Sequence, residues 1–306
     1  MKRSYRKVNI EISNICNIQC SFCPEVIRPK KLMELSLFQR IIEEVAPLTK
    51  LVAFHLMGEP LIHPQLDEFV EIAHSHKLKI FFVTNGILLR PKMYDLLLHP
   101  AFRQISFSLH SFSDYFPDKD PTSYLENIFS FTQRAMAERP GLFINYRLWN
   151  LQDGIGGRNG SKNLDFLERI ESRFSVSVPR NINTNAKKSY LIKRPLSLHF
   201  DTEFTWPMMD LPVIGVQGTC HGLSSHFGVL SDGSVVPCCL DKEGDLTLGR
   251  IPEQSLSEIL SSPRARKILH GFKNNDLVED LCQRCQYIER FQVTQSDNIP
   301  LAQPVQ

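Results

Sequence analysis

The chain has 306 residues, of which 42% are hydrophobic and 22% are charged, close to the averages of globular proteins. This composition excludes collagen, coiled coils and wholesale disorder, and the length fits one large domain or a large domain with a smaller one. The 35 basic and 33 acidic side chains leave a formal net charge of +2, which gives no strong signal for nucleic acid. Because no secretory signal and no membrane-spanning apolar run is visible, we expect a cytoplasmic protein.

Strand-like and helix-like segments alternate over roughly the first 180 residues. Five segments have strand character: 8–12, 51–56, 79–83, 104–109 and 142–148. Apolar residues at helical spacing lie between them, and the first such helix is predicted to open at the capping box Ser36-Leu37-Phe38-Gln39. Repeated β–α units predict parallel strands with right-handed crossovers, so we expect an α/β fold with its chemistry at the carboxyl ends of the strands.

The eight cysteines fall into two groups separated by a long stretch that contains none. The first group is Cys16, Cys20 and Cys23, a C-x3-C-x2-C loop directly after the first strand. A structural zinc site needs four protein ligands, and no histidine lies near enough in sequence to complete the set. Three thiolates on one loop instead suit a 4Fe-4S cluster in which one iron stays open to a ligand.

This loop resembles that of the radical S-adenosylmethionine (SAM) superfamily. The resemblance implies a partial (β/α)6 barrel of the TIM type, with the amino and carboxylate groups of SAM chelating the open iron. It also implies reductive cleavage of SAM to a 5′-deoxyadenosyl radical that abstracts a hydrogen atom from a substrate. The electron would come from a flavodoxin- or ferredoxin-like partner.

Further marks of the superfamily follow the next strands. Met57-Gly58-Glu59-Pro60 resembles the Gly-Gly-Glu-Pro motif whose backbone carbonyls bind the SAM amino group, with Met57 in place of the first glycine. Thr84-Asn85-Gly86 is also familiar from these proteins. The resemblance places Ser108 against the SAM ribose or carboxylate and makes Arg147 a candidate for the carboxylate. The alternatives are a solvated serine at a strand end and a salt bridge in the barrel wall.

The C-terminal part carries the second cysteine group. Asp232-Gly233 between two apolar runs predicts a hairpin, and it is followed by Cys238, adjacent Cys239, and the pair Cys282 and Cys285. This order resembles the SPASM and twitch extensions of radical SAM enzymes, which bind auxiliary 4Fe-4S clusters. Five remaining cysteines are too few for two fully thiolate-ligated clusters, so we expect one.

The expected ligands of that cluster are Cys220, Cys238, Cys282 and Cys285. In an extended chain, Cys238 and Cys239 would point to opposite faces, so one of them should ligate and the other be spare. The spacing from Gly233 favours Cys238. A zinc ion held by four thiolates is the alternative occupant.

These observations predict four regions: a barrel over 1–190, a bridge over 191–215, a SPASM- or twitch-like domain over 216–290 and a disordered tail over 291–306. The run Gly154-Ile155-Gly156-Gly157 should form a flexible loop at the catalytic rim.

We expect a radical SAM enzyme acting on an unidentified peptide, protein or small molecule. Because the first strand begins by about residue 8, no peptide-recognition domain is expected before it, which disfavours a leader-peptide-dependent maturase. The alternative from another class is a non-enzymatic iron–sulfur electron carrier.

Overall fold

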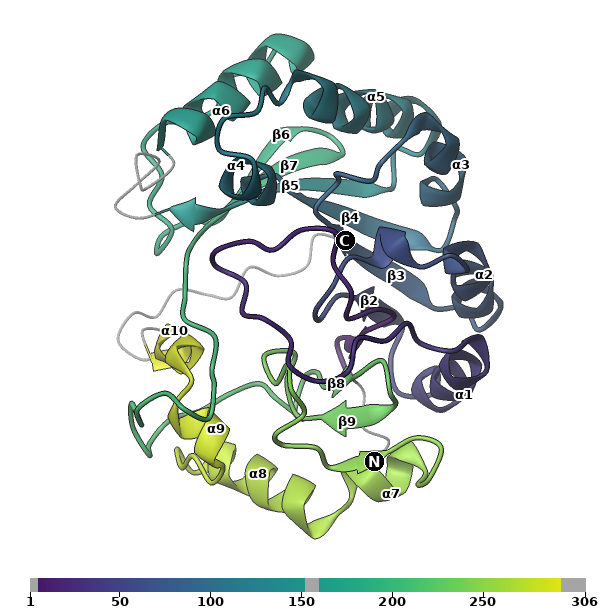
Figure 1. Ribbon diagram of the computed structural model, residues 1–306, viewed down its shortest axis with the longest axis vertical. Coiled ribbons are helices and arrows are strands. Elements are labelled where there is room, and N and C mark those ends of the chain that lie inside the picture. Colours follow the sequence, from purple (N-terminus) through teal and green to yellow (C-terminus); the bar gives the residue numbers. More distant parts are fainter. Residues whose placement is uncertain (1–4, 152–159, 293–306) are drawn as a thin grey trace.

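The computed structural model describes residues 5–151 and 160–292, and its centre is one continuous β-sheet (Figure 1). The strands are β1 (Val8–Ile10), β2 (Leu51–Phe54), β3 (Lys79–Thr84), β4 (Phe102–Ser108), β5 (Phe143–Leu151), β6 (Ser189–Lys193), β7 (Leu196–Thr202), β8 (Gly228–Val229), β9 (Ser234–Val236) and β10 (Gly249–Arg250). Their order in the sheet is β10-β9-β8-β1-β2-β3-β4-β5-β7-β6. Six neighbouring strands in this order, β1 to β5 and β7, pair in parallel and form the partial barrel that the resemblance implies.

Helices cover the outer face of this sheet (Figure 1). They are α1 (Leu35–Val45), α2 (Leu66–Ser75), α3 (Tyr94–Leu97), α4 (His110–Tyr115), α5 (Thr122–Glu138) and α6 (Gly160–Phe174), with α7 (Leu256–Leu260), α8 (Pro263–Lys273), α9 (Asp280–Gln283) and α10 (Glu289–Gln292) in the C-terminal part. Short 3-10 turns are η1 (Pro60–Ile62), η2 (Pro91–Met93) and η3 (Gln286–Ile288). None of the helices in the described ranges is long and apolar enough to cross a membrane.

The sixth parallel strand lies beyond the end that the sequence predicts for the barrel. The sequence predicts that the barrel ends at residue 190 and that a bridge follows over 191–215. In the structure, β7 pairs with β5 from Leu196 onward, inside this predicted bridge. In the sequence, Pro195 indicates a break in regular secondary structure. In the fold it lies in the tight turn between the paired strands β6 and β7. A proline there removes no hydrogen bond from the ladder.

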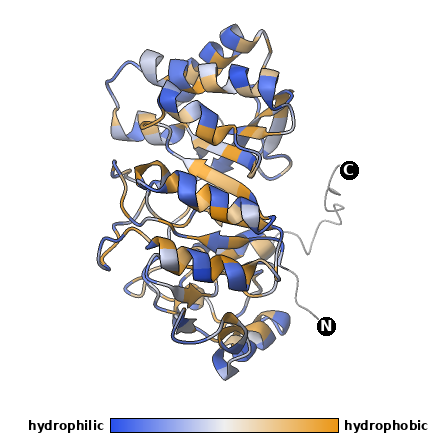
Figure 2. Ribbon diagram, turned by 90° about the vertical axis from the view of Figure 1, so that its right-hand side faces the viewer, coloured by the Kyte–Doolittle hydropathy of each residue, from blue (hydrophilic) through white to orange (hydrophobic). Residues whose placement is uncertain are grey.

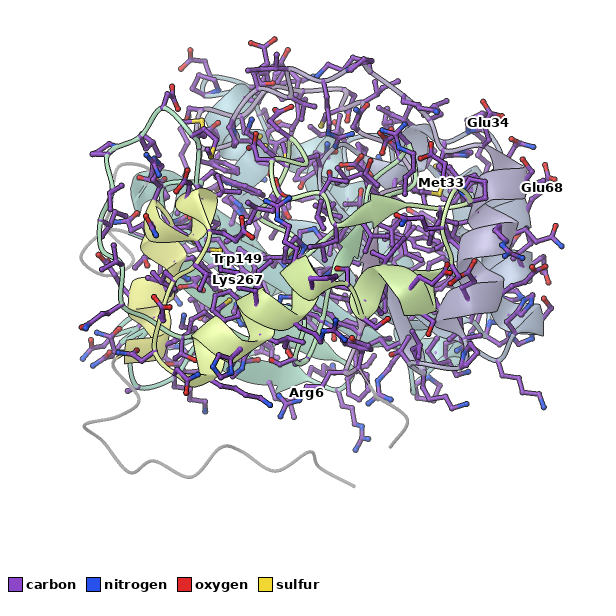
Figure 3. The ribbon with its side chains drawn as sticks, turned by 90° about the horizontal axis from the view of Figure 1, so that it is seen from below. Arg6, Met33, Glu34, Glu68, Trp149 and Lys267 are labelled. Atoms are coloured by element: carbon purple, nitrogen blue, oxygen red, sulfur yellow. The ribbon has the colours of Figure 1, made fainter. Side chains whose placement is uncertain are left out.

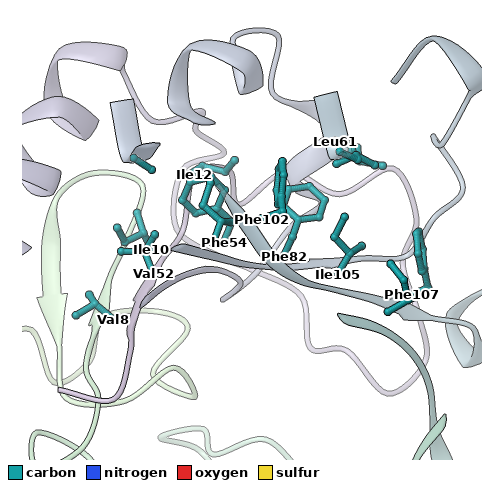
Figure 4. Close-up of a cluster of buried hydrophobic side chains, with 14 of the residues drawn as sticks. Val8, Ile10, Ile12, Val52, Phe54, Leu61, Phe82, Phe102, Ile105 and Phe107 are labelled. Carbon is teal, nitrogen blue, oxygen red and sulfur yellow. The ribbon is translucent and has the colours of Figure 1, made fainter. Parts of the chain in front are cut away.

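The hydrophobic core lies between the sheet and its outer helices. Figure 4 shows its centre, where side chains such as Ile10, Phe54, Phe82 and Phe102 point to the same face of successive strands. All four are at most 1% exposed. Figure 2 shows hydrophilic and hydrophobic residues mixed along the helices. In α1 the buried residues are Phe38, Ile41, Ile42 and Val45, at the spacing of one helix face, which is the pattern of a surface helix on a sheet.

The predicted capping box at the first helix is wrong. Helix α1 already begins at Leu35, and its N-cap is Glu34, whose side chain makes no capping hydrogen bond. Met33 and Glu34 lie at the same edge of the molecule as Glu68 of α2 (Figure 3), and His63 Nε2 contacts the carbonyl oxygen of Met33 at 3.0 Å. Tertiary contacts therefore set the start of this helix.

The C-terminal part continues the sheet of the barrel. Strand β8 pairs in parallel with β1, and β9 and β10 extend it in antiparallel fashion. The long loop between β1 and α1 passes between the barrel and the C-terminal elements (Figure 1). The predicted glycine-rich loop 154–157 and the tail from 293 lie outside the described residues, and the first residues of the predicted tail belong to α10.

Candidate active site

The loop that follows β1 carries Cys16, Cys20 and Cys23 at the carboxyl end of the sheet. It closes on itself through the Cys23 amide, which donates to the Cys20 carbonyl at 3.1 Å, and through the Gln19 side-chain amide, which donates to the Cys23 carbonyl at 2.7 Å. Cys20 is buried, Cys23 is half-buried and Cys16 is exposed. The loop is thus a compact turn with three thiols and not an open strand.

Neighbouring elements hold this loop in place. The Ser21 amide and hydroxyl both donate to the Asp114 carboxylate of α4 at 2.6 Å. After β3, the Asn85 side chain donates to Asn17 Oδ1 at 2.9 Å and lies 3.7 Å from Cys16 Sγ. The turn Thr84-Asn85-Gly86, a general turn signal in the sequence, therefore has a specific role in supporting the first cysteine.

Gly58 packs directly against the backbone of the cysteine loop. Its φ is +73°, in the left-handed region that glycine adopts without strain. A Cβ atom at this position would lie 2.4 Å from the carbonyl oxygen of Ser13 and 2.8 Å from that of Ile15. The next residue, Glu59, donates its amide to the Ile15 carbonyl at 2.8 Å. The second glycine of the motif is therefore required for this contact, whereas Met57 in the first position is tolerated and buried.

The carboxylate of Glu59 joins this segment to the turn after β3. It accepts hydrogen bonds from the amide of Leu61 at 3.0 Å, from Thr84 Oγ1 at 2.7 Å and from the amide of Asn85 at 2.7 Å. Burial raises the pKa of Glu59 to about 7, although these three donors oppose the shift. Glu59 is thus a structural link between the two motifs.

The three thiols fit an iron–sulfur cluster better than a single ion. A zinc ion bound at about 2.3 Å places its sulfur ligands about 3.8 Å apart. Among the described residues, the sulfurs of Cys16, Cys20 and Cys23 do not all lie within 4.8 Å of one another. Burial raises the pKa of Cys20 to about 12 and that of Cys23 to about 11, so the free thiols are protonated at neutral pH. A metal centre must therefore displace those protons when it binds.

The second cysteine group comes from three separate segments. Cys220 precedes β8, Cys238 and Cys239 follow β9, and Cys282 and Cys285 lie in and just after α9. The predicted hairpin between β8 and β9 is present, and its Gly233 has a φ of +89°. Burial raises the pKa of Cys285 to about 11, and the neighbouring Cys220 and Cys239 act in the same direction.

Cys238 and Cys239 do not point to opposite faces. Strand β9 ends at Val236, so the two cysteines lie in a turn and not in extended chain. Their sulfurs and a ring nitrogen of His226 all lie within 4.8 Å of one another. No local pattern in the sequence points to His226 as a neighbour of these cysteines. The geometry therefore leaves the choice of ligand between Cys238 and Cys239 open.

One cavity of about 600 Å³ brings all of these residues together. It is lined by every predicted site residue: Cys16, Cys20, Cys23, Met57, Gly58, Glu59, Pro60, Ser108, Arg147, Cys220, Cys238, Cys282 and Cys285. Its volume is in the range of small-molecule and cofactor sites. Both cysteine groups therefore face the same space, although nearly 200 residues separate them in sequence.

Ser108 and Arg147 occupy opposing positions on the neighbouring strands β4 and β5. The guanidinium carbon of Arg147 lies 4.3 Å from the ring centroid of Trp149, and burial lowers the pKa of Arg147 to about 10. His110 contacts the Arg147 carbonyl through Nδ1 at 3.1 Å. Burial lowers the pKa of His110 to about 4, which fits a neutral supporting role.

Hydrogen bonds to Lys242 and Glu243 join the loop after β1 to the C-terminal part. The Arg28 guanidinium pairs with Glu11, and it donates to the carbonyl of Lys242 at 2.6 Å. The Glu243 carboxylate accepts from the amide of Ile27 at 2.9 Å and from that of Arg28 at 3.0 Å. The contacts to Lys242 and Glu243 cross more than 200 positions of sequence, and no local pattern predicts them.

Comparison with known proteins agrees with this geometry. Residues 10–146 match the model of the radical SAM superfamily, and residues 220–286 match that of an iron-sulfur cluster-binding domain, SPASM. A curated relative, the S-adenosyl-L-methionine-dependent 2-deoxy-scyllo-inosamine dehydrogenase of Niallia circulans, is 25% identical over 118 residues, which is 36% of this chain and 47% of that protein. The S-adenosylmethionine-dependent nucleotide dehydratase of Selenomonas ruminantium is 27% identical over 107 residues, 34% of this chain and 39% of that protein. The match thus spans less than half the length of either relative.

Solved structures show the same fold. BtrN in complex with AdoMet and 2-DOIA superposes with a TM-score of 0.59 at 18% identity, covering 94% of each chain. Streptococcus suis SuiB bound to precursor peptide SuiA gives a TM-score of 0.59 at 16% identity, covering 94% of this chain and 73% of SuiB. With its three-cysteine loop on a partial barrel and its second cysteine group facing the same cavity, the chain belongs to the radical SAM superfamily and carries a SPASM iron–sulfur domain.

Proposed function

We propose that this chain cleaves SAM reductively and removes a hydrogen atom from its substrate. The observation that supports this most directly is the shared cavity, in which a loop with three thiols faces a second group of thiols. Cys16, Cys20 and Cys23 hold the SAM-binding 4Fe-4S cluster. When bound, that cluster supplies the electron that converts SAM to a 5′-deoxyadenosyl radical. An electron carrier would need neither this cavity nor the segment that borders it.

The residues around the loop position SAM. The backbone carbonyls of 57–60 accept hydrogen bonds from its amino group, and Glu59 keeps that segment against the turn after β3. Ser108, which lines the cavity at the end of β4, donates to the ribose or carboxylate. The backbone acceptors do not depend on the side chain at Met57, so this departure from the family motif preserves the interaction.

Cys220, Cys238, Cys282 and Cys285 hold one auxiliary 4Fe-4S cluster, and Cys239 is the alternative to its neighbour. Among the described residues, the four thiols do not all gather within 4.8 Å as the ligands of a single zinc ion would, whereas Cys238, Cys239 and His226 do. Because they face the same cavity as the first group, the auxiliary cluster is placed to bind the substrate or to accept its electron.

The substrate is a peptide, a protein or a small molecule. Among the similar proteins, BtrN is described with 2-DOIA and SuiB with its precursor peptide SuiA, so both classes occur on this fold. The reductant is a flavodoxin- or ferredoxin-like protein.

The decisive experiment is anaerobic reconstitution followed by SAM and dithionite. The protein should form 5′-deoxyadenosine and methionine, and the Cys16→Ala, Cys20→Ala, Cys23→Ala triple variant should form neither. Ile27→Ala is the matched control, because this side chain is 85% exposed on the same loop and its amide contact to Glu243 is retained. Undiminished SAM cleavage by the folded triple variant would refute the proposal.

A further inference from the structure

Two positive side chains share one aromatic ring inside the barrel. Lys7 Nζ lies 5.6 Å and the Arg147 guanidinium carbon 5.5 Å from the ring centroid of Phe81. Within residues 5–151 and 160–292, neither forms a salt bridge, and Arg147 Nε has no hydrogen-bond partner. Arg147 is only 5% exposed, so its charge is buried without compensation from a carboxylate. A charge in this position is costly for folding unless a ligand pairs with it.

The surroundings hold the guanidinium in place without neutralising it. The Trp149 ring, 4.3 Å from the guanidinium carbon, is itself fixed by the hydrogen bond that its Nε1 donates to His199 Nδ1 at 2.8 Å. Burial and the charge of Arg147 lower the pKa of His199 to about 4 and lower that of His55 well below its usual value. Both histidines are therefore neutral near pH 7, and the two positive side chains that contact the Phe81 ring are Arg147 and Lys7.

The register of the sheet sets the height of Arg147 in the barrel. Arg147 pairs with Ser108 on β4, and the preceding Phe107 pairs with Thr84 on β3, so Arg147 lies level with Asn85 at the carboxyl ends of the strands. Its guanidinium lies near the rings of Phe81 and Trp149. An anionic group that enters this end of the barrel can therefore pair with it. If that group were the carboxylate of SAM, removal of the Arg147 charge would weaken SAM binding, so SAM binding by an Arg147 variant separates the two roles.

We propose that Arg147, assisted by Lys7, binds an anionic group of the substrate, a carboxylate or a phosphate, in the barrel lumen. The planar guanidinium of Arg147 can donate two parallel hydrogen bonds to such a group. The ammonium of Lys7, which contacts the same Phe81 ring, adds a second positive charge. This inference rests on the proposed function, because it assigns the substrate to the cavity that SAM shares. It narrows the substrate to molecules that carry such a group.

The test uses the reconstituted full chain and measures anion binding without turnover. Inorganic phosphate and acetate are titrated separately against chloride at constant ionic strength, in a Trp206→Phe background that leaves Trp149 as the only tryptophan. The favoured anion should change the Trp149 fluorescence and, near ten times its dissociation constant, raise the melting temperature by about 3 °C. The anion with the larger response identifies the group as phosphate or carboxylate.

Arg147→Met is the critical variant. It should lose both anion responses, bind SAM as the wild type does, and melt no lower than the wild type, because it removes an uncompensated buried charge. Lys267→Gln, on the exposed face of α8 (Figure 3), is the charge-matched control and should keep both responses.

Three results would overturn the proposal: no response of the wild type to either anion, an undiminished response in Arg147→Met, or loss of SAM binding in that variant. Failure of SAM cleavage in the wild type would instead refute the proposed function and leave the anion measurements interpretable.

Discussion

Replacing Gly58 by alanine tests whether the contact between the motif after β2 and the cysteine loop positions the first cluster. The left-handed φ of +73° costs an alanine about 1–2 kcal/mol. The new Cβ would also lie 2.4 Å from the Ser13 carbonyl oxygen, and both neighbours are backbone atoms that no side-chain rotation can move. Relieving that overlap displaces the loop and strains the 2.8 Å bond from Glu59 to Ile15, at a further cost of about 1–3 kcal/mol.

Gly86 provides the matched control for this experiment. Its φ of +76° carries the same backbone cost, but a Cβ there would meet only side-chain atoms, the nearest being Ile128 Cδ1 at 3.0 Å. Gly86→Ala should therefore lower the free energy of unfolding by about 1–2 kcal/mol and keep the iron. Gly58→Ala should lower the free energy of unfolding by about 2–5 kcal/mol and should also lose the iron of the first cluster.

The assays are chemical denaturation, iron content and the visible absorption of the anaerobically reconstituted proteins. With two 4Fe-4S clusters the wild type should bind about eight irons, and Gly58→Ala about four. Equal stability and equal iron content in the two alanine variants would show that the close approach to Ser13 does not position the loop.

Three further predictions follow from the same geometry. Cys282→Ala with Cys285→Ala should remove about four irons and still produce 5′-deoxyadenosine uncoupled from product, and loss of SAM cleavage in a folded, half-loaded protein would instead indicate an electron relay. The pKa of Glu59 is raised to about 7 in the folded chain, so its ionisation should lower the free energy of unfolding by about 3 kcal/mol as the pH rises from about 4.5 to about 7. Glu59→Gln should make this free energy less dependent on pH, as measured by denaturation curves across the same range. Arg28→Met leaves the buried Glu11 carboxylate unpaired and should cost about 3–5 kcal/mol at neutral pH, less at pH 4, where the carboxyl is protonated.

Most residues of the candidate site could be predicted from short sequence motifs. The cysteine spacing, the order of the motifs and their positions after strands are all visible in short segments. Because parallel strands bring their carboxyl ends to one edge of a sheet, motifs that follow strands can be expected to meet there. Cys16 and Cys285 are therefore assignable to two cysteine groups from the sequence, whereas the cavity that both groups line is a property of the fold.

The parts that the sequence did not predict depend on contacts between distant segments. The sixth barrel strand lies across a proline-containing turn, and its pairing with β5 is a property of the whole sheet. The turn at Cys238 and Cys239 replaces the extended chain that a period-two pattern assumes. The surroundings of the Arg147 guanidinium combine Trp149, two residues along β5, with Phe81 from β3, and the contact to Phe81 depends on the assembled sheet.

The same long-range contacts explain why the two cysteine groups form one site. The sheet runs from the barrel into the C-terminal part through β8 and β1, so the two parts share backbone hydrogen bonds. The turn that carries Cys239 leads within four residues to Glu243, whose carboxylate binds the backbone of the first cysteine loop at Ile27 and Arg28. A displacement of either loop therefore strains the other, and a metal centre that orders one of them stabilises the contacts that both require. If the proposed reaction takes place between the two cysteine groups, these shared contacts keep their spacing constant.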